Sequence, residues 1–144
     1  MRPALVTGSS GLLGRCLVTQ LRADGVPLRL LDVVPPPPEW LDRDVEALST
    51  DMRDAAGVRA AMRGVDVVYH LAAGQRMKPQ FSAMGEDDIR AMNVAGVANV
   101  LAAAEAEGVG KVVVISSSGV YGVPTTVPDI VICDHGLPGM DGMK

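Results

Sequence analysis

A glycine-rich turn near the start of the chain has the composition of an anion-binding loop. Residues 7–14 read TGSSGLLG, with two serines between the first two of three glycines. The apolar run 3–6 before the turn is typical of a buried parallel strand. After the turn, apolar residues recur at helical spacing. They are Leu12, Leu13, Cys16, Leu17 and Leu21. Strand, turn and helix therefore follow one another in the order that a phosphate-binding loop needs.

Each glycine has its own expected role. Gly8 permits a tight turn, Gly11 lets the backbone approach a phosphate, and Gly14 lets the helix pack close to the sheet. The helix N-terminus then presents unpaired N–H groups to the anion, and Ser9 and Ser10 add hydroxyl donors. The alternative is an ordinary loop between a strand and a helix, which such a turn alone does not exclude. The residues predicted to contact the phosphates are Gly8, Ser10, Gly11, Leu12, Leu13 and Gly14.

An acidic residue follows at the distance expected for ribose recognition. Asp32 ends a second apolar run, residues 26–31. A carboxylate at the tip of the second strand accepts hydrogen bonds from both hydroxyls of an adenosine ribose and repels a 2′-phosphate. The sequence therefore predicts NAD as the cofactor and makes NADP less favourable. The alternative is that Asp32 only ends the strand before the turn into residues 35–38. Arg29, three positions earlier on the same strand, is expected to point away.

Length and composition indicate a single domain. The 144 residues are 48% hydrophobic, which suffices for one core of moderate size. A net charge of −4 gives no electrostatic basis for binding nucleic acid. No leader-like start and no run of about eighteen apolar residues is present, so we expect a cytoplasmic protein that does not enter membranes. Cys16 and Cys133 lack metal-ligand spacing, so we predict reduced core thiols and no metal site.

The remainder of the chain alternates strands with helices. Strands are expected at 44–49, 65–71 and 111–116, and helices at 54–63 and 87–107. This order predicts a Rossmann-type α/β fold with a doubly wound, mostly parallel sheet, incomplete at its end and covered on both faces. In such folds ligands bind at the carboxyl ends of the strands.

Five short motifs recur along the chain. They are TGxxGxxG at 7–14, DMRD at 51–54, HLAA at 70–73, NVAG at 93–96 and SSSGVYG at 116–122. With these motifs, residues 4–122 resemble the cofactor-binding part of extended short-chain dehydrogenases/reductases. This is the NAD-dependent epimerase/dehydratase family, whose members act mostly on nucleotide sugars.

The resemblance implies roles for residues beyond the first turn. Asp51 would hydrogen-bond the adenine amino group, and the backbone of Met52 would help to read the ring. The segment Leu71-Ala72-Ala73 would pass beside the phosphates and the nicotinamide ribose. Asn93 would brace the active-site end of the sheet through backbone hydrogen bonds.

Simpler interpretations of these positions stay open from the residues alone. Asp51 also suits a turn or a cap partner for the next helix, and Asn93 also suits a solvated helix position. Residues 116–118 also suit a polar loop after a strand. His70 is predicted to be a core or strand-end histidine without a direct chemical role.

The sequence lacks part of the catalytic set that the resemblance implies. In that family a tyrosine phenolate takes a proton from a sugar hydroxyl while hydride moves to NAD. A lysine four residues later lowers the tyrosine pKa, and a serine assists. Ser117 or Ser118 can fill the serine role, but neither Tyr69 nor Tyr121 has a lysine four positions later. We therefore expect NAD binding without full catalysis.

The end of the chain departs from the family pattern. Residues 127–144 resemble the middle of a response-regulator receiver domain, with Asp134 at the phosphoacceptor position. Other residues that a receiver needs are missing, so Asp134 is predicted to be a turn residue at a strand end. We expect a cofactor-binding domain at 1–122 and a junction with a receiver-like segment at 123–144, as in a chimera or a truncated protein. The final strand is expected at a sheet edge, antiparallel, or exchanged between molecules.

Three functions are compatible with these features. The first is the NAD-binding part of a nucleotide-sugar epimerase/dehydratase-like oxidoreductase, with a nucleotide sugar as candidate substrate and a homodimer as candidate assembly. The second is a noncatalytic dinucleotide-binding or engineered α/β scaffold. The third, least favoured, is a receiver-like signalling module.

Overall fold

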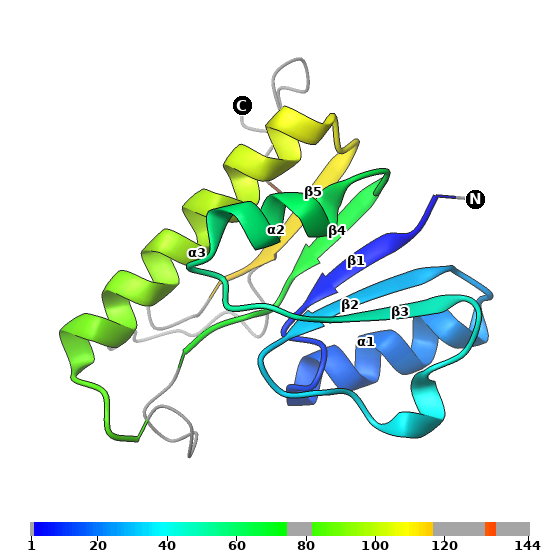
Figure 1. The fold of residues 1–144 in the computed structure, drawn as a ribbon, viewed down its shortest axis with the longest axis horizontal. Helices are drawn as coiled ribbons and strands as arrows, with labels where there is room; N and C mark the ends of the chain where they lie inside the picture. The colour runs from blue at the N-terminus through cyan, green and yellow to red at the C-terminus, as the bar shows by residue number, and fades with distance from the viewer. Residues whose placement is uncertain (1, 75–81, 117–131, 135–144) are drawn as a thin grey trace, which may run out of the picture.

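The computed structural model describes residues 2–74, 82–116 and 132–134. They form a six-stranded sheet in the order β3-β2-β1-β4-β5-β6 (Figure 1). The strands are β1 (Ala4–Thr7), β2 (Leu28–Asp32), β3 (Val45–Ser49), β4 (Val67–His70), β5 (Lys111–Ile115) and β6 (Ile132–Asp134). The helices are α1 (Leu12–Ala23), the 3₁₀ turn η1 (Pro38–Trp40), α2 (Ala55–Met62) and α3 (Glu86–Glu107).

The sheet is parallel from β3 to β5, which confirms the predicted Rossmann-type α/β fold. β1 lies between β2 and β4, so the strand order reverses beside it. This reversal is the topological switch point at which open α/β sheets bind ligands. β6 joins the edge of the sheet antiparallel to β5, one of the arrangements expected for the final strand.

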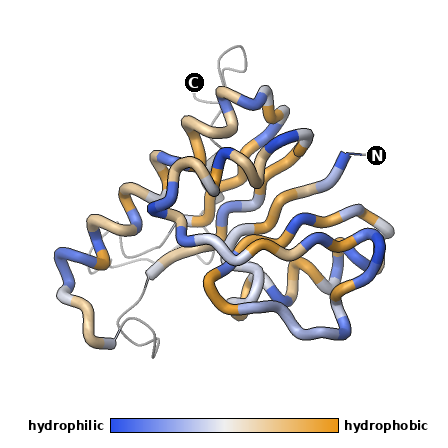
Figure 2. Tube along the Cα trace, in the orientation of Figure 1, coloured by the Kyte–Doolittle hydropathy of each residue, from blue (hydrophilic) through white to orange (hydrophobic). Residues whose placement is uncertain are grey.

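Helices cover both faces of the sheet, and each covered face has its own core. α1 lies under β1–β3, where Val18 packs against Val6 and Leu30. α2 and α3 lie together on the opposite face, where Val58 and Val100 belong to a larger buried cluster. In Figure 2 the central strands are mostly hydrophobic and the outer turns mostly hydrophilic. Near-continuous apolar strands are what a parallel sheet between two helical layers requires.

The buried face of α1 differs from the sequence-based prediction. Leu12, Leu13 and Cys16 belong to the predicted apolar helical pattern, but all three are exposed, with Leu12 83% accessible. The helix instead buries Gly14 and Val18. The core position predicted for Cys16 is therefore wrong, because α1 makes its closest contact through Gly14, which has no side chain. Cys16 is a free thiol as predicted, but it is not in the core; the side chain of Cys133 lies outside the described residues.

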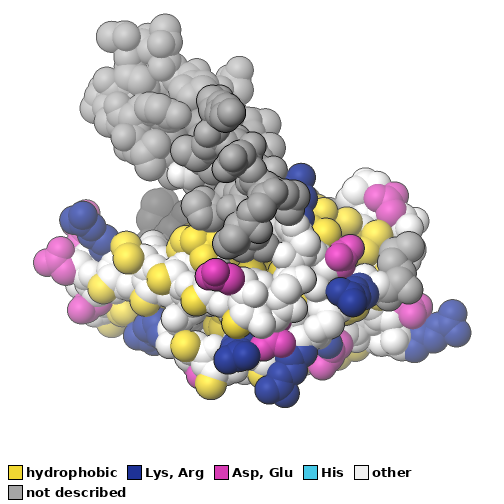
Figure 3. Space-filling model, turned by 90° about the horizontal axis from the view of Figure 1, so that it is seen from above, with side chains coloured by type: hydrophobic (Ala, Val, Ile, Leu, Met, Phe, Trp, Pro, Cys, Tyr) yellow, Lys and Arg dark blue, Asp and Glu magenta, His cyan; other side chains and the backbone are white. Residues whose placement is uncertain are grey.

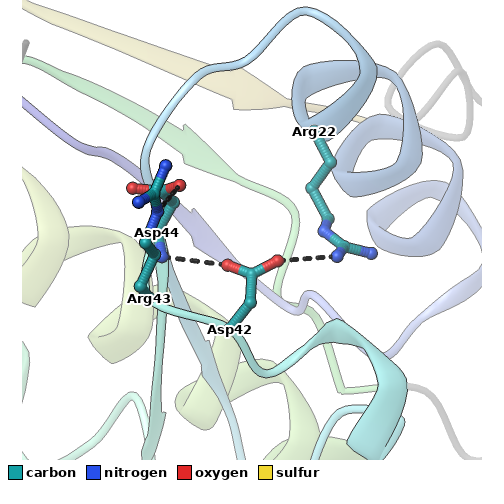
Figure 4. Close-up of polar contacts among 4 residues, drawn as sticks. All are labelled: Arg22, Asp42, Arg43 and Asp44. Atoms are coloured by element: carbon teal, nitrogen blue, oxygen red, sulfur yellow. Dashed lines mark hydrogen bonds and ion pairs between the residues drawn. The ribbon is translucent and has the colours of Figure 1, made fainter.

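Turns at the amino end of the sheet reverse the chain after each helix. Gly25, Gly64 and Gly108 follow α1, α2 and α3 with φ between +67° and +71°, the conformation that favours glycine at helix ends. The Asp42 carboxylate also accepts hydrogen bonds from Arg22 Nη2 (2.9 Å) and from the backbone N–H of Asp44 (2.9 Å), so it joins α1 to the start of β3 (Figure 4).

The surface carries charges of both signs. On the face shown in Figure 3, acidic and basic side chains alternate around the rim instead of gathering by sign. None of the helices within the described ranges combines the length and apolarity needed to cross a membrane.

Candidate functional site

A crevice opens at the carboxyl ends of β1–β4, at the switch point of the sheet. It holds about 860 Å³ of space, part of it open to solvent. Its walls are Gly8, Ser10, Gly11, Leu31, Asp32, Val33, Val34, Thr50, Asp51, Met52, Ala72, Ala73, Gly74, Met92, Asn93 and Gly96.

The turn after β1 brings three backbone segments into contact. Gly8 has φ +69°, and a Cβ there would lie 2.7 Å from the Ala72 nitrogen. A Cβ on Gly14 would lie 2.8 Å from the Cα of Ser9. Gly14 therefore packs against the loop itself, whereas the sequence predicted that it would pack against the sheet. Any side chain at Gly8 or Gly14 would push this loop into the crevice or the helix away from it.

The N-terminus of α1 is open at this turn. Its N-cap residue Gly11 provides no side-chain hydrogen bond, and no acidic residue stands in the first turn. The N–H groups at the start of the helix, with the positive end of the helix dipole, therefore favour an anion. The predicted hydroxyl donors are used differently. Ser10 Oγ donates to the Val34 carbonyl (2.8 Å), and Ser9 is fully buried with its hydroxyl unpaired among the described residues.

Asp32 links the glycine-rich turn after β1 to the end of β2. Its Oδ2 accepts from the Ser10 N–H (3.0 Å), and its Oδ1 accepts from the Val34 N–H (3.0 Å). Each carboxylate oxygen keeps a further acceptor site for a ligand hydroxyl. Arg29 points away from Asp32, as expected, and donates to the carbonyls of Ala61 and Arg63 at the end of α2.

Asp51, in the turn after β3, is held by a neighbouring cation. Arg53 donates to both Asp51 carboxylate oxygens, from Nε at 3.0 Å and from Nη2 at 2.7 Å, and its backbone N–H is 2.8 Å from Oδ1. These bonds hold the pKa of Asp51 below its usual value and raise the pKa of Arg53. The carboxylate is therefore ionised and oriented at the crevice wall. The cap of α2 is the separate residue Asp54.

Thr7 joins the ends of β1 and β4 beneath the crevice. Its hydroxyl lies 2.8 Å from His70 Nδ1 and accepts from the Ala72 N–H (3.3 Å). His70 is only 3% exposed, and burial lowers its pKa to about 4. The buried imidazole is neutral, and its tautomer decides whether Nδ1 accepts from the Thr7 hydroxyl or donates to it. Its burial agrees with the predicted role of a core histidine.

Asn93 reaches from α3 to the loop after β4. Its Oδ1 accepts from the Gly74 N–H (2.7 Å), and its Nδ2 donates to the Gly74 carbonyl (3.1 Å). Both ends of the side-chain amide thus hold one backbone unit. This is the bracing expected from the resemblance, and it differs from a solvated helix position.

The crevice gathers nine of the thirteen residues predicted to contact a cofactor. Leu12 and Leu13 are exposed in the first turn of α1, Gly14 is buried under the turn, and Leu71 packs on the α1 side of the sheet. Ser117 and Ser118 lie outside the described residues. In the described part of the chain, no three His, Cys, Asp or Glu side chains are placed to hold a metal ion.

Some residues that shape the crevice were not identified from the sequence. Thr7 does so through its hydroxyl, which accepts from the Ala72 N–H, and Gly74 does so through the backbone N–H that it donates to Asn93. Gly96 contributes by its lack of a side chain, and Asn99 by a hydrogen bond to the Met52 carbonyl (2.8 Å). The position of Thr7, directly before the first glycine of the turn, was the signal in the sequence that could have identified it. No local pattern indicates that Asn99 faces a turn more than forty positions away.

A doubly wound sheet with this glycine turn, open helix N-terminus and crevice defines a Rossmann-type nucleotide-binding protein. The chain belongs to the NAD dependent epimerase/dehydratase family, whose model matches residues 4–136. The match continues beyond residue 122, where the resemblance was expected to stop. The comparisons give no support to a receiver-like segment, and the proposed division of the chain at 122 stays a prediction.

Individual relatives agree with the family assignment. A dTDP-4-dehydro-6-deoxy-D-allose reductase of Streptomyces sp is 33% identical over 134 residues, covering 88% of this chain and 41% of the relative. A short-chain dehydrogenase/reductase superfamily protein from Agrobacterium tumefaciens, solved with bound NAD, has a TM-score of 0.69 and 33% identity over 92% of this chain and 39% of its own.

A double mutant of dTDP-glucose 4,6-dehydratase from Streptomyces venezuelae, solved with NAD and DAU bound, has a TM-score of 0.72 and 32% identity. This match covers 88% of the present chain and 42% of the dehydratase. The chain spans 12% to 41% of the length of the curated relatives that it matches. It therefore corresponds to one part of those proteins.

Proposed function

We propose that this chain binds NAD in the crevice, as the cofactor-binding part of an oxidoreductase that acts on a nucleotide sugar. The position of Asp32 carries the proposal. Its carboxylate is fixed by two backbone N–H groups, directly beside the turn that leads to the open N-terminus of α1. A diphosphate at the helix and a ribose at Asp32 are thus neighbouring sites, as a dinucleotide requires.

The other walls of the crevice suit the rest of the cofactor. Asp51 is an oriented acceptor for the adenine amino group. Ala72, Ala73 and Gly74 leave space beside the β4 strand end for the nicotinamide ribose, and Asn93 holds that loop. NAD supplies the hydride acceptor when bound. The residues described here bind and orient it.

The preference for NAD over NADP follows from the charge of Asp32. A 2′-phosphate would stand beside this carboxylate, and the nearby Arg15 already donates its Nε–H to the Ser10 carbonyl (3.0 Å). Repulsion therefore outweighs any attraction at this position.

Full turnover is not part of the proposal. Proton transfer from a sugar hydroxyl in the family's manner needs a tyrosine with a lysine four positions later, and the sequence has no such pair. The nucleotide-sugar substrate, a homodimeric assembly and a cytoplasmic location are parts of the proposal that rest on the family assignment.

Calorimetric titration of the full chain tests the proposal. We expect saturable binding of NAD and binding of NADP that is weaker by about tenfold or more. Absence of binding at millimolar NAD by folded protein would overturn it. Incubation with NAD and a panel of nucleotide sugars, followed by NADH absorbance and product analysis, should show no turnover; sustained turnover would contradict the catalytic part.

A further inference from the structure

Helix α3 contacts the crevice walls at two separate turns through asparagine side chains. Asn93 binds Gly74 in the loop after β4, and Asn99 Nδ2 donates to the Met52 carbonyl (2.8 Å) in the turn after β3. These are the two asparagines of the whole sequence. Neither hydrogen bond belongs to regular secondary structure, so each fixes a loop against the helix.

The helix surface between the two asparagines also contacts the turn. Gly96 stands three residues from each of them, and residues three apart lie on one side of a helix. A Cβ at Gly96 would come within 3.2 Å of the Met52 Cβ. Met52 is thus held from two directions, by contact with Gly96 and by the hydrogen bond from Asn99. Asn99 is half-buried, which limits replacement of that bond by water.

Met52 lies between the two members of the ion pair at the crevice wall. The chain segment Asp51-Met52-Arg53 closes on itself, because Arg53 binds the Asp51 carboxylate through both its side chain and its backbone N–H. The Met52 carbonyl and the Arg53 N–H belong to the same peptide unit, so any displacement of the carbonyl moves the N–H that donates to Asp51 Oδ1. Asn99 therefore fixes the Met52–Arg53 peptide unit, on which the contact between Arg53 and Asp51 depends.

We propose that Asn99 is a positioning residue for the adenine end of the crevice, acting through the Met52 carbonyl on the Asp51–Arg53 pair. The proposal rests on the proposed function in that it takes the base beside Asp51 to be adenine. Asn99 does not touch the base in this assignment. It sets the place and orientation of the carboxylate that recognises the amino group.

The test compares NAD with nicotinamide hypoxanthine dinucleotide, in which a carbonyl replaces the adenine amino group. We expect the unaltered chain to prefer NAD by about tenfold, because a carboxylate accepts from the amino group and repels the carbonyl. Asn99→Ala should reduce this preference to about twofold, while helix propensity favours a folded variant. Ala103→Gly is the matched control, since it weakens the buried side of α3 away from both loops and should keep the full preference.

A second measurement needs no cofactor. In the free chain, Asn99→Ala should raise the pKa of the Asp51 carboxyl, followed by NMR titration, because the Arg53 bonds loosen; Ala103→Gly should not. Equal weakening of both dinucleotides by Asn99→Ala, with an unmoved Asp51 pKa, would show a merely structural role and overturn the proposal. A raised Asp51 pKa in Asn99→Ala without NAD binding by the unaltered chain would uphold the coupling between Asn99 and Asp51 and refute the proposed function and the adenine assignment.

Discussion

Glycines of the same backbone type serve different needs at the two ends of the sheet. At the amino end, Gly25, Gly64 and Gly108 have positive φ, and a Cβ on any of them would meet nothing within 4 Å. At the carboxyl end, Gly8 has the same conformation, but a Cβ would meet the Ala72 backbone at 2.7 Å. The amino end requires only chain reversal. The carboxyl end requires in addition that two strand ends approach each other, and this approach forms the crevice.

Polar groups are also more tightly packed at the carboxyl end of the sheet than at the amino end. The Arg22–Asp42 pair at the amino end is solvent-accessible, and water screens its attraction. At the carboxyl end, Thr7 and His70 are buried, and Asp32 is fixed by backbone donors. The comparison indicates that changes of charge should matter at the crevice and matter little at the opposite end.

The largest expected effect on NAD affinity comes from an alanine substitution at Gly8, compared with the same substitution at Gly25. Gly8→Ala should weaken NAD binding by about 100-fold or more, because the new Cβ displaces the turn from Ala72. Gly25→Ala carries the same backbone strain, about 1 kcal/mol, without a steric contact, so NAD affinity should stay unchanged. Calorimetry with NAD and chemical denaturation of both variants provide the measurements. If the two variants bound NAD with similar affinity, the proposed difference between glycines at the amino and carboxyl ends of the sheet would be wrong.

The second prediction concerns pH. His70 has its folded pKa lowered from 6.5 to about 4 by burial, so the unfolded chain binds the extra proton first as the pH falls. The contribution of neutral His70 is present above about pH 6.5 and is lost between pH 6.5 and 4, at a cost of about 3 kcal/mol in the free energy of unfolding.

Urea unfolding across this pH range measures the effect. His70→Asn keeps an acceptor for the Thr7 hydroxyl and removes the titration, so the slope between pH 6.5 and 4 should flatten. Asp42 and Asp51 have pKa values lowered from 3.8 and lose their contributions below this window. An equally steep slope in His70→Asn would place the responsible group elsewhere.

The third prediction addresses cofactor choice. Asp32→Asn removes the negative charge and sets an amide N–H₂ against one of its two backbone donors. NAD binding should weaken by about tenfold and the preference over NADP should fall by a similar factor. Titration with both dinucleotides measures this. If the ratio of the two affinities does not change, another group selects the ribose.

The smallest effect is expected at the amino end. Asp42→Asn removes a carboxylate that also accepts a backbone N–H, and whose pKa is lowered chiefly by the hydrogen bond from Arg22. Because this pair is solvent-accessible, we expect little change in melting temperature and none in NAD affinity. It is the matched control for Asp32→Asn, and a loss of NAD affinity here would show that the two ends are coupled.

Much of the fold could be predicted from the sequence, because its patterns are local. Alternation of apolar runs with helical spacing predicted β1 to β5 and α1 to α3 to within a few residues, and the glycine turn and Asp32 were placed correctly at strand ends. The exposed face of α1 was not predicted. Leu12 and Leu13 satisfy a helical stripe, but the need of Gly14 to contact Ser9 rotates them outward.

The amino-acid sequence by itself determined the order of strands and helices, the positions of the glycines and the residue types available at each strand end, since these depend on short-range spacing and backbone sterics. Only the tertiary structure decided how distant residues meet at the crevice. The hydrogen bonds of Thr7 with His70 and of Asn99 with Met52 join residues more than forty positions apart in the sequence. The physical reason is that a parallel sheet brings the carboxyl ends of separate strands to one edge, where hydrogen bonds form between groups that no local pattern relates.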